Sequence, residues 1–350
     1  MSNELSGRDA LNITVTTKAT AAGDVAKDSL RAYEPLKIQE VERLTVVVIT
    51  DNYYDSVRPQ PVIGQRYRAA RGASIHAEHG LSYFIETTVN GKSSAFMFDY
   101  GLDPHGVINN MGLLDVNLSR VDALGLSHGH FDHWGGLAEI LRQNRSKMRK
   151  GTPLYVGDET FAHRFSIRPG THEPIDIGQL RREEIERFGT INIVEIRDPV
   201  EVNPGCYYTG NIERVTDYEK VPPGLLIERN GELEHDLFKG EQAAVFSLKD
   251  KGLVILSGCA HAGIVNTVKH AQKVTGIKKV HAVIGGFHLV NVKPEIIQRT
   301  VADIKAIGPD YIVPAHCTGF EAVTLFAQEM PKQFILNTAG TKYVMTSYTA

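Results

Sequence analysis

The sequence predicts an α+β fold, and three features of the 350-residue chain support this prediction. The β-branched run Leu44–Thr50 is typical of a buried strand. Two further strand-like runs, Leu81–Val89 and Ser94–Asp99, are joined by Asn90-Gly91, a strong signal for a β-hairpin turn. Later in the chain, two apolar runs are each followed by a glycine-containing turn with histidines and then by an amphipathic segment typical of a helix. Strands that lead into both hairpins and helices indicate a mixed α+β domain.

The chain is organised around one histidine-rich turn. This turn follows the apolar run Val121–Leu126, which predicts a strand, and precedes Leu137–Met148, which predicts a helix. Within six residues it contains four side chains that commonly bind metals, namely His128, His130, Asp132 and His133. The two alternate histidines project the same way and the adjacent Asp-His pair points elsewhere, an arrangement that suits two metal ions held close together. Imidazole and carboxylate ligands favour two divalent transition-metal ions, with zinc as the first choice and manganese or iron as alternatives.

The stretch His-Gly-His-Phe-Asp-His resembles the metal-binding signature of the metallo-β-lactamase superfamily. This resemblance implies a four-layer αββα sandwich with a metal centre at one edge. It also implies that Asp99, within Phe98-Asp-Tyr-Gly101, orients a metal-bound imidazole and does not bind metal itself. Because the superfamily includes lactonases, thioesterases, phosphodiesterases, nucleases and oxygen-reducing proteins, the fold alone specifies no single reaction.

A second turn of the same kind follows the apolar run Gly252–Leu256. It reads Ser-Gly-Cys-Ala-His-Ala-Gly and leads into a predicted helix, Ile264–Val274. His261 is therefore a further candidate metal ligand, the alternative being a histidine that caps the helix. Cys259 lies where many members of the superfamily carry a bridging aspartate, and it is either a thiolate ligand or a small buried residue.

Two more histidines follow predicted strands. His288 comes after Val280–Ile284 and a Gly-Gly pair, and it is either a metal ligand or a group that contacts the substrate or the ligands. His316 comes after the short run Tyr311–Val313, where the resemblance implies the final metal-binding histidine. The predicted metal ligands are His128, His130, Asp132, His133, His261 and His316, and the predicted catalytic residues are Asp132 and His288.

Composition and charge disfavour several classes of protein. Hydrophobic residues make up 42% of the chain, which is enough for a substantial core. A formal charge of −3 and a pI near 6.5 argue against a nucleic-acid partner. No apolar run is long enough to span a bilayer, so no membrane partner is expected. Three cysteines imply no disulfide framework, which predicts a reducing, cytoplasmic location.

Residues 1–40 are predicted to form a flexible extension, outside a single domain of residues 41–350. The extension is rich in Ala, Thr, Asp and Ser and lacks the apolar periodicity needed to bury a surface. Deleting residues 1 to about 38 is therefore expected to leave the fold and the metal content intact.

The rest of the chain yields a coarser prediction. Residues from about Arg164 to Gly189 are polar and predict a loop with an exposed helix at Arg181–Arg187. The basic residues between 142 and 150 indicate a solvated helix end more than a phosphate site. The remaining predicted elements are strands at Pro153–Val156 and Ile191–Ile196, helices at Val301–Ile307 and Phe320–Gln328, and a closing strand within Phe334–Thr346.

Several motifs, taken in order from about Leu44 to the C-terminus, resemble one branch of the superfamily, usually labelled 7,8-dihydropterin-6-yl-methyl-4-(β-D-ribofuranosyl)aminobenzene 5′-phosphate synthase. Besides the histidine-rich turn, these motifs are Glu78-His-Gly-Leu-Ser82, Thr209-Gly-Asn-Ile-Glu-Arg214, Ser257-Gly-Cys-Ala-His261, Gly285-Gly-Phe-His288 and His316-Cys-Thr-Gly319. The chain departs from the family pattern in two places. The usual third histidine after Asp132-His133 has no counterpart, since His163 and His172 lie in the polar segment, and we expect His261 to take its place. Gly157-Asp158 stands where branch members often carry His-Pro.

These features together predict a metal-dependent hydrolase. A metal-activated water is expected to attack an ester, lactone or phosphate-type bond of a small, anionic molecule. One alternative, implied by the branch, is a transferase that condenses a dihydropterin with an aminobenzoate and releases pyrophosphate. A second alternative is a metal-containing protein that binds a ligand without turning it over. The expected partner is a small-molecule substrate, and self-association into a homo-oligomer is a further expectation.

Overall fold

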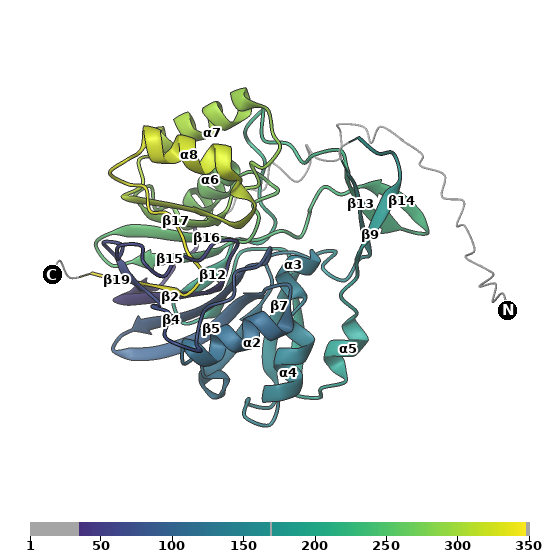
Figure 1. Ribbon diagram of the computed structural model, residues 1–350, viewed down its shortest axis with the longest axis vertical. Coiled ribbons are helices and arrows are strands. Elements are labelled where there is room, and N and C mark those ends of the chain that lie inside the picture. The colour runs from purple at the N-terminus through teal and green to yellow at the C-terminus, as the bar shows by residue number, and fades with distance from the viewer. Residues whose placement is uncertain (1–34, 169, 348–350) are drawn as a thin grey trace.

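The computed structural model describes residues 35–168 and 170–347, and Figure 1 shows two large β-sheets packed face to face between layers of helices. The first sheet contains β2 (Arg43–Thr50), β3 (Gly64–Arg66), β4 (Ser82–Val89), β5 (Lys92–Tyr100), β6 (Val121–Gly125), β7 (Thr152–Gly157), β10 (Ile191–Ile196) and β19 (Thr341–Thr346). Its strand order is β10-β7-β6-β5-β4-β2-β19-β3. The predicted hairpin is confirmed, because β4 and β5 pair antiparallel across Asn90-Gly91.

The second sheet carries most of the C-terminal half of the chain. It contains β1 (Glu40–Val41), β11 (Val200–Asn203), β12 (Cys206–Tyr208), β15 (Ala244–Leu248), β16 (Gly252–Ser257), β17 (Val280–Gly286) and β18 (Tyr311–Ala315). The order is β11-β12-β15-β16-β17-β18, with β1 paired to β15. Because β16, β17 and β18 run parallel, their carboxyl ends meet at one edge of this sheet.

Helices cover the outer faces of both sheets (Figure 1). The helical elements are α2 (Pro104–Leu113), η1 (Leu118–Arg120), α3 (Phe131–Trp134), α4 (Leu137–Asn144), α5 (Arg182–Glu186), α6 (Ile264–Thr275), α7 (Pro294–Ile307), η2 (His316–Thr318) and α8 (Phe320–Glu329). The predicted helices are found, although α4 ends at Asn144 and α7 begins well before Val301. Among the described residues, no helix is both long enough and apolar enough to cross a membrane.

Three apolar clusters hold the layers together. Phe98, Phe246 and Ile284 belong to the cluster between the two sheets. A second cluster joins the first sheet to α2 and α4, and a third joins the second sheet to α6, α7 and α8. β2 shows the reason for this arrangement, since all its residues after Arg43 are buried and it can therefore lie in the middle of the sandwich. The predicted four-layer αββα sandwich is confirmed.

A third, smaller sheet stands beside the sandwich (Figure 1). It consists of β8 (Arg164–Ile167), β9 (Pro174–Gly178), β13 (Leu225–Arg229) and β14 (Glu232–His235), in the order β14-β13-β8-β9. The prediction of a loop from Arg164 to Gly189 was therefore wrong for the residues of β8 and β9. These two strands are short, and β8 gains its second partner from β13, far away in the sequence, so local patterning does not reveal them.

Residues 36–41 contact the sandwich, whereas residues 1–34 lie outside the described residues. The backbone N–H of Leu36 donates to the carbonyl oxygen of Val274 at 2.7 Å, and Ile38 packs against the apolar cluster under α6. The backbone N–H of Gln39 donates to the Tyr207 hydroxyl at 3.0 Å. These contacts place the useful cut point for a deletion at residue 34, a few residues before the predicted one.

Removing residues 1–34 is expected to leave the melting temperature unchanged, because the composition of that stretch cannot bury much apolar area. Removing residues 1–40 deletes Leu36 and Ile38 with their contacts and is expected to cost about 1–2 kcal/mol of unfolding free energy. Thermal denaturation of both shortened proteins beside the full chain measures the difference. Equal melting temperatures for the two shortened proteins would contradict the assignment of residues 36–40 to the folded unit.

Candidate metal centre

Three buried histidines form the first ligand cluster, called here the tri-histidine cluster. His128 and His130 follow β6, and His261 follows β16 in the facing sheet. Each can offer a ring nitrogen, and these atoms all lie within 4.8 Å of one another. The ring centroids of His128 and His130 are 4.8 Å apart, and each lies 4.9 Å from the His261 ring. The packing of the two sheets thus brings together histidines that lie far apart in the sequence.

The tri-histidine cluster has the protonation state that a metal site needs. Burial lowers the pKa of His128 and His261 well below the usual value, and it lowers the pKa of His130 to about 3. All three rings are therefore neutral near pH 7, the state in which imidazole binds metals. Within the described residues, Nε2 of His128 and both ring nitrogens of His261 are buried without a hydrogen-bond partner. Because unpaired buried polar atoms are costly, these nitrogens fit a bound cation.

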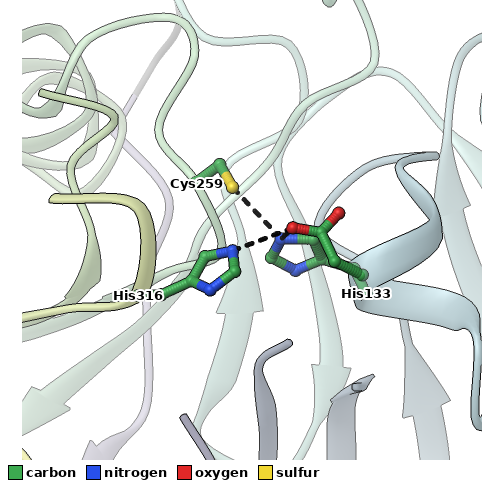
Figure 2. Close-up of side chains that lie close together, drawn as sticks. His133, Cys259 and His316 are labelled. Carbon is green, nitrogen blue, oxygen red and sulfur yellow. Dashed lines mark hydrogen bonds and ion pairs between the residues drawn. The ribbon is translucent and has the colours of Figure 1, made fainter. Parts of the chain in front are cut away.

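The second ligand cluster, called here the mixed cluster, consists of Asp132, His133, Cys259 and His316. Nε2 of His133 lies 3.1 Å from Sγ of Cys259, and Nε2 of His316 lies 3.1 Å from Oδ2 of Asp132. Figure 2 shows the side chains of His133, Cys259 and His316 pointing toward one another from different parts of the chain. A carboxylate, a thiol and two imidazoles within 4.8 Å form a ligand set typical of a divalent transition metal.

Charge in the mixed cluster also favours a cation. Burial opposes protonation of His316, yet the neighbouring Cys317 and Asp132 together raise its pKa to about 9. Burial likewise disfavours the charged form of Asp132, but the adjacent His133 and His316 lower the pKa of that carboxyl well below its usual value. The anionic groups thus attract positive charge into a buried space, and a divalent cation satisfies that attraction as well as protons do.

Two buried carboxylates, Asp99 and Asp51, fix the positions of histidines in the mixed cluster. Oδ2 of Asp99 lies 2.6 Å from Nδ1 of His133, and Oδ1 of Asp99 accepts the backbone N–H of Ser127 at 2.8 Å. This contact turns Nε2 of His133 toward the mixed cluster, the supporting role implied for Asp99 by the family resemblance. Asp51, at the end of β2, accepts the backbone N–H of His316 at 2.8 Å and so fixes the start of η2.

A third group of candidate ligands connects the two clusters through Cys259 and His261. Cys259, His261 and His288 form a third group of side chains that could share a metal ion. The ring centroids of His261 and His288 are 4.1 Å apart, and His288 is half-buried where the other candidate ligands are buried. The structure therefore keeps both roles open for His288, as a further ligand or as a group that contacts substrate. Cys259 belongs to this group and to the mixed cluster, and His261 belongs to this group and to the tri-histidine cluster, so the three groups adjoin one another.

The structure brings every predicted site residue to one edge of the sandwich, and it groups His261 with His128 and His130. That His261 replaces the missing third histidine stays a prediction. His163 is engaged elsewhere, with Asp176 and Glu228 of the small sheet. His79 has no predicted role, yet its Nε2 lies 3.6 Å from Oδ2 of Asp132 and its ring stacks on His316 with the centroids 4.8 Å apart. Its signals in the sequence are its place just before β4 and the motif Glu78-His-Gly-Leu-Ser82, which carries part of the family resemblance without indicating a role for the histidine.

The comparisons with known proteins agree with this fold. The profile of the metallo-β-lactamase superfamily matches residues 77–191. A solved metal-dependent hydrolase of the β-lactamase superfamily superposes with a TM-score of 0.67 at 25% identity, covering 87% of this chain and 100% of the other. The metallo-β-lactamase fold protein YhfI from Bacillus subtilis superposes with a TM-score of 0.50 at 11% identity, a likeness of fold alone. The chain belongs to the metallo-β-lactamase superfamily and is an enzyme of that fold.

Within the superfamily, a protein of Methanocaldococcus jannaschii is similar over most of its length. It is named 7,8-dihydropterin-6-methyl-4-(beta-D-ribofuranosyl)-aminobenzene-5'-phosphate synthase and is 36% identical over 269 residues, which cover 76% of this chain and 90% of the relative. An uncharacterized protein from the same organism is 29% identical over 72% of this chain and 88% of its own length. The predicted resemblance to the synthase branch is confirmed.

The position of Cys259 leads to a spectroscopic prediction. With cobalt(II) in place of the native metal, the protein is expected to show a near-ultraviolet thiolate-to-cobalt charge-transfer band, because Sγ of Cys259 lies among the mixed-cluster ligands. Cys259→Ser is expected to abolish the band. Cys317→Ser is the matched control, since Cys317 is also buried and adjacent but belongs to none of the ligand groups. Retention of the band in Cys259→Ser would mean that Cys259 is only a small buried residue.

Proposed function

We propose that this enzyme is a metal-dependent hydrolase that holds two divalent ions, zinc as the first choice, and cleaves an ester, lactone or phosphate-type bond of a small anionic molecule. The observation that carries the proposal is the pair of adjoining ligand clusters at one edge of the sandwich. When bound, two such metals supply Lewis acidity and lower the pKa of a water molecule toward neutrality. The likeness to a solved metal-dependent hydrolase supports the same reaction class.

The charges of the ligands favour an anionic substrate. The tri-histidine cluster offers neutral imidazoles only, and the mixed cluster offers two groups that can be anionic, Asp132 and Cys259. Two anionic ligands do not neutralise two divalent cations, so the occupied centre keeps a net positive charge. A carboxylate, phosphate or polarised carbonyl group is therefore attracted to it.

The proposal assigns roles toward the substrate to two side chains, Asp132 and His288. One carboxylate oxygen of Asp132, Oδ2, lies near the side chains of His79, His133 and His316. Asp132 is therefore close both to other candidate ligands and to the exposed side chain of His79. The His79 side chain is 59% exposed, so the centre opens to solvent where His79 lies over His316. His288 is half-buried on the other side of Cys259. In this proposal Asp132 binds metal and orients the attacking water, whereas His288 contacts the substrate.

A transferase is the second candidate, favoured by the relative that is named a synthase and is 36% identical. In that reaction an aminobenzoate partner would attack a dihydropterin whose pyrophosphate departs, and the same net positive centre would stabilise the leaving group. The proposal also includes three properties predicted from the sequence. These are a cytoplasmic location, the absence of nucleic-acid and membrane partners, and self-association into a homo-oligomer.

A substrate panel distinguishes the two reactions. The protein is loaded with zinc or manganese and incubated with chromogenic phosphodiesters, esters and lactones, with metal-stripped protein as the control. Metal-dependent release of the chromophore is the expected result. Release of pyrophosphate from a dihydropterin pyrophosphate, only when an aminobenzoate partner is added, would select the transferase in its place. A loaded protein that turns over no member of either set would contradict both reactions.

A further inference from the structure

We propose that the link between the small sheet and the main sandwich positions the tri-histidine cluster, with Phe238 as the residue that orients His261. The link comprises residues 236–242, between β14 and β15. Phe238 is a positioning residue in this proposal, since it acts on a substrate only through a ligand. The inference rests on the metal-binding part of the proposed function and is independent of the reaction catalysed.

The Phe238 ring contacts all three histidines of the cluster. It stacks on His261 with the ring centroids 3.7 Å apart and the planes 13° from parallel. It meets His130 edge-on at 4.9 Å and 89°, and His128 at 5.7 Å and 62°. A flat ring in these contacts restricts the rotation of each imidazole, and the buried nitrogens of His261 have no hydrogen bond to do so within the described residues.

The backbone of Phe238 is in a conformation that a bulky side chain seldom adopts. Its φ is +50°, in the left-handed region favoured by glycine. Such a conformation persists only where the surroundings enforce it, and it occurs often beside functional sites. Here the surroundings include Asp236, whose Oδ1 accepts the backbone N–H of Phe238 at 2.8 Å. The strained backbone thus places the ring against His261.

Asp236 is held in turn by a buried ion pair. Its Oδ2 accepts from Nε of Arg164 at 2.8 Å, and both side chains are almost completely buried. Nη1 of Arg164 lies 3.4 Å from the carbonyl oxygen of Gly129, the residue between His128 and His130. The guanidinium group therefore connects Phe238 with the turn that carries the other two histidines. A Cβ at position 129 would lie 2.3 Å from that same Nη1 and 2.4 Å from the backbone oxygen of Thr160, so the close approach requires glycine there.

The same link also fixes the backbone around the ligands. The buried Glu241 carboxylate accepts the backbone N–H groups of His261 and Ala262 at 2.7 and 2.6 Å. The backbone N–H of Gln242 donates to the carbonyl oxygen of Ser127, next to His128, at 3.0 Å. Side-chain and backbone contacts from one short segment therefore converge on the tri-histidine cluster. The histidines of the mixed cluster are held by hydrogen bonds to Asp99 and Asp51 instead.

Zinc affinity tests this inference. The full-length protein is titrated against a chromophoric chelator that competes for zinc, which gives a dissociation constant for each of two ions. Phe238→Ala is expected to weaken the binding of one ion by about 10–100-fold, the usual cost of losing a group that orients a ligand, and to leave the other unchanged. Phe238→Leu keeps apolar volume but lacks the flat ring, so it is expected to weaken the binding of the same ion. This second variant keeps the test decisive if the alanine variant folds poorly.

A control variant separates positioning from plain stability. Arg229→Gln, in β13 of the small sheet, removes ion pairs with Glu159 before β8 and with Glu234 of β14, neither of which involves Phe238, and is expected to leave both zinc affinities unchanged. Phe238→Leu could melt at a lower temperature in its metal-free form and still bind both ions with wild-type affinity. That result would show that Phe238 contributes only to core packing and would overturn the inference. Wild-type protein that binds no zinc would overturn the proposed function together with it.

Discussion

Asp132→Asn is expected to lower kcat by a thousandfold or more, on the order of several kcal/mol of lost transition-state stabilisation. Asp132 supplies one oxygen, Oδ2, that lies 3.1 Å from Nε2 of His316 and 3.8 Å from Nε2 of His133. An amide in its place removes both a ligand and a negative charge that offsets the metals. Steady-state kinetics on whichever substrate the panel identifies, with metal content determined alongside, measures the loss.

His288→Ala is the informative comparison for Asp132→Asn. His288 follows β17, is half-buried and lies beside His261, outside both the tri-histidine and mixed clusters. We expect this variant mainly to raise KM while both metals are retained. If His288→Ala empties a metal site, and Asp132→Asn keeps both metals and most of its activity, the assigned roles of ligand and substrate contact must be exchanged.

The candidate metal ligands could be predicted because they lie in short turns that directly follow predicted strands. His128, His130, Asp132 and His133 occupy one turn after β6, and His261 and His316 follow β16 and β18. Strands that are buried on both faces give continuous apolar runs, which reveal where each strand ends and a polar turn begins. Because parallel strands present their carboxyl ends at one edge, such turns are expected to meet.

The small sheet and the contacts behind the ligands could not be predicted in the same way. β8 pairs with β13 across a large separation in sequence, and neither strand has a long apolar run. Phe238 looks in the sequence like any single aromatic residue in a polar stretch, and its contact with His261 depends on its backbone conformation and on a buried ion pair. His79 likewise lies beside Asp132 through a long-range contact, since the backbone N–H of Leu81 donates to the carbonyl oxygen of Asp132 at 3.2 Å. Long-range packing decides these features, and single-sequence periodicity does not report it.

His130→Ala is expected to remove at least one of the two metal ions that we propose the wild-type chain holds. His130 is one of three ligands in a cluster without an anionic group, so two neutral imidazoles would remain for a dication in a buried space. The loss of affinity is expected to exceed the roughly 10–100-fold typical of a group that only orients a ligand. Elemental analysis after metal-replete expression and dialysis measures metal per chain, and His105→Ala is the control because that imidazole is exposed and outside the ligand groups. Wild-type protein without metal under these conditions would contradict the assignment of the clusters, and unchanged metal content in His130→Ala would contradict the ligand role of His130.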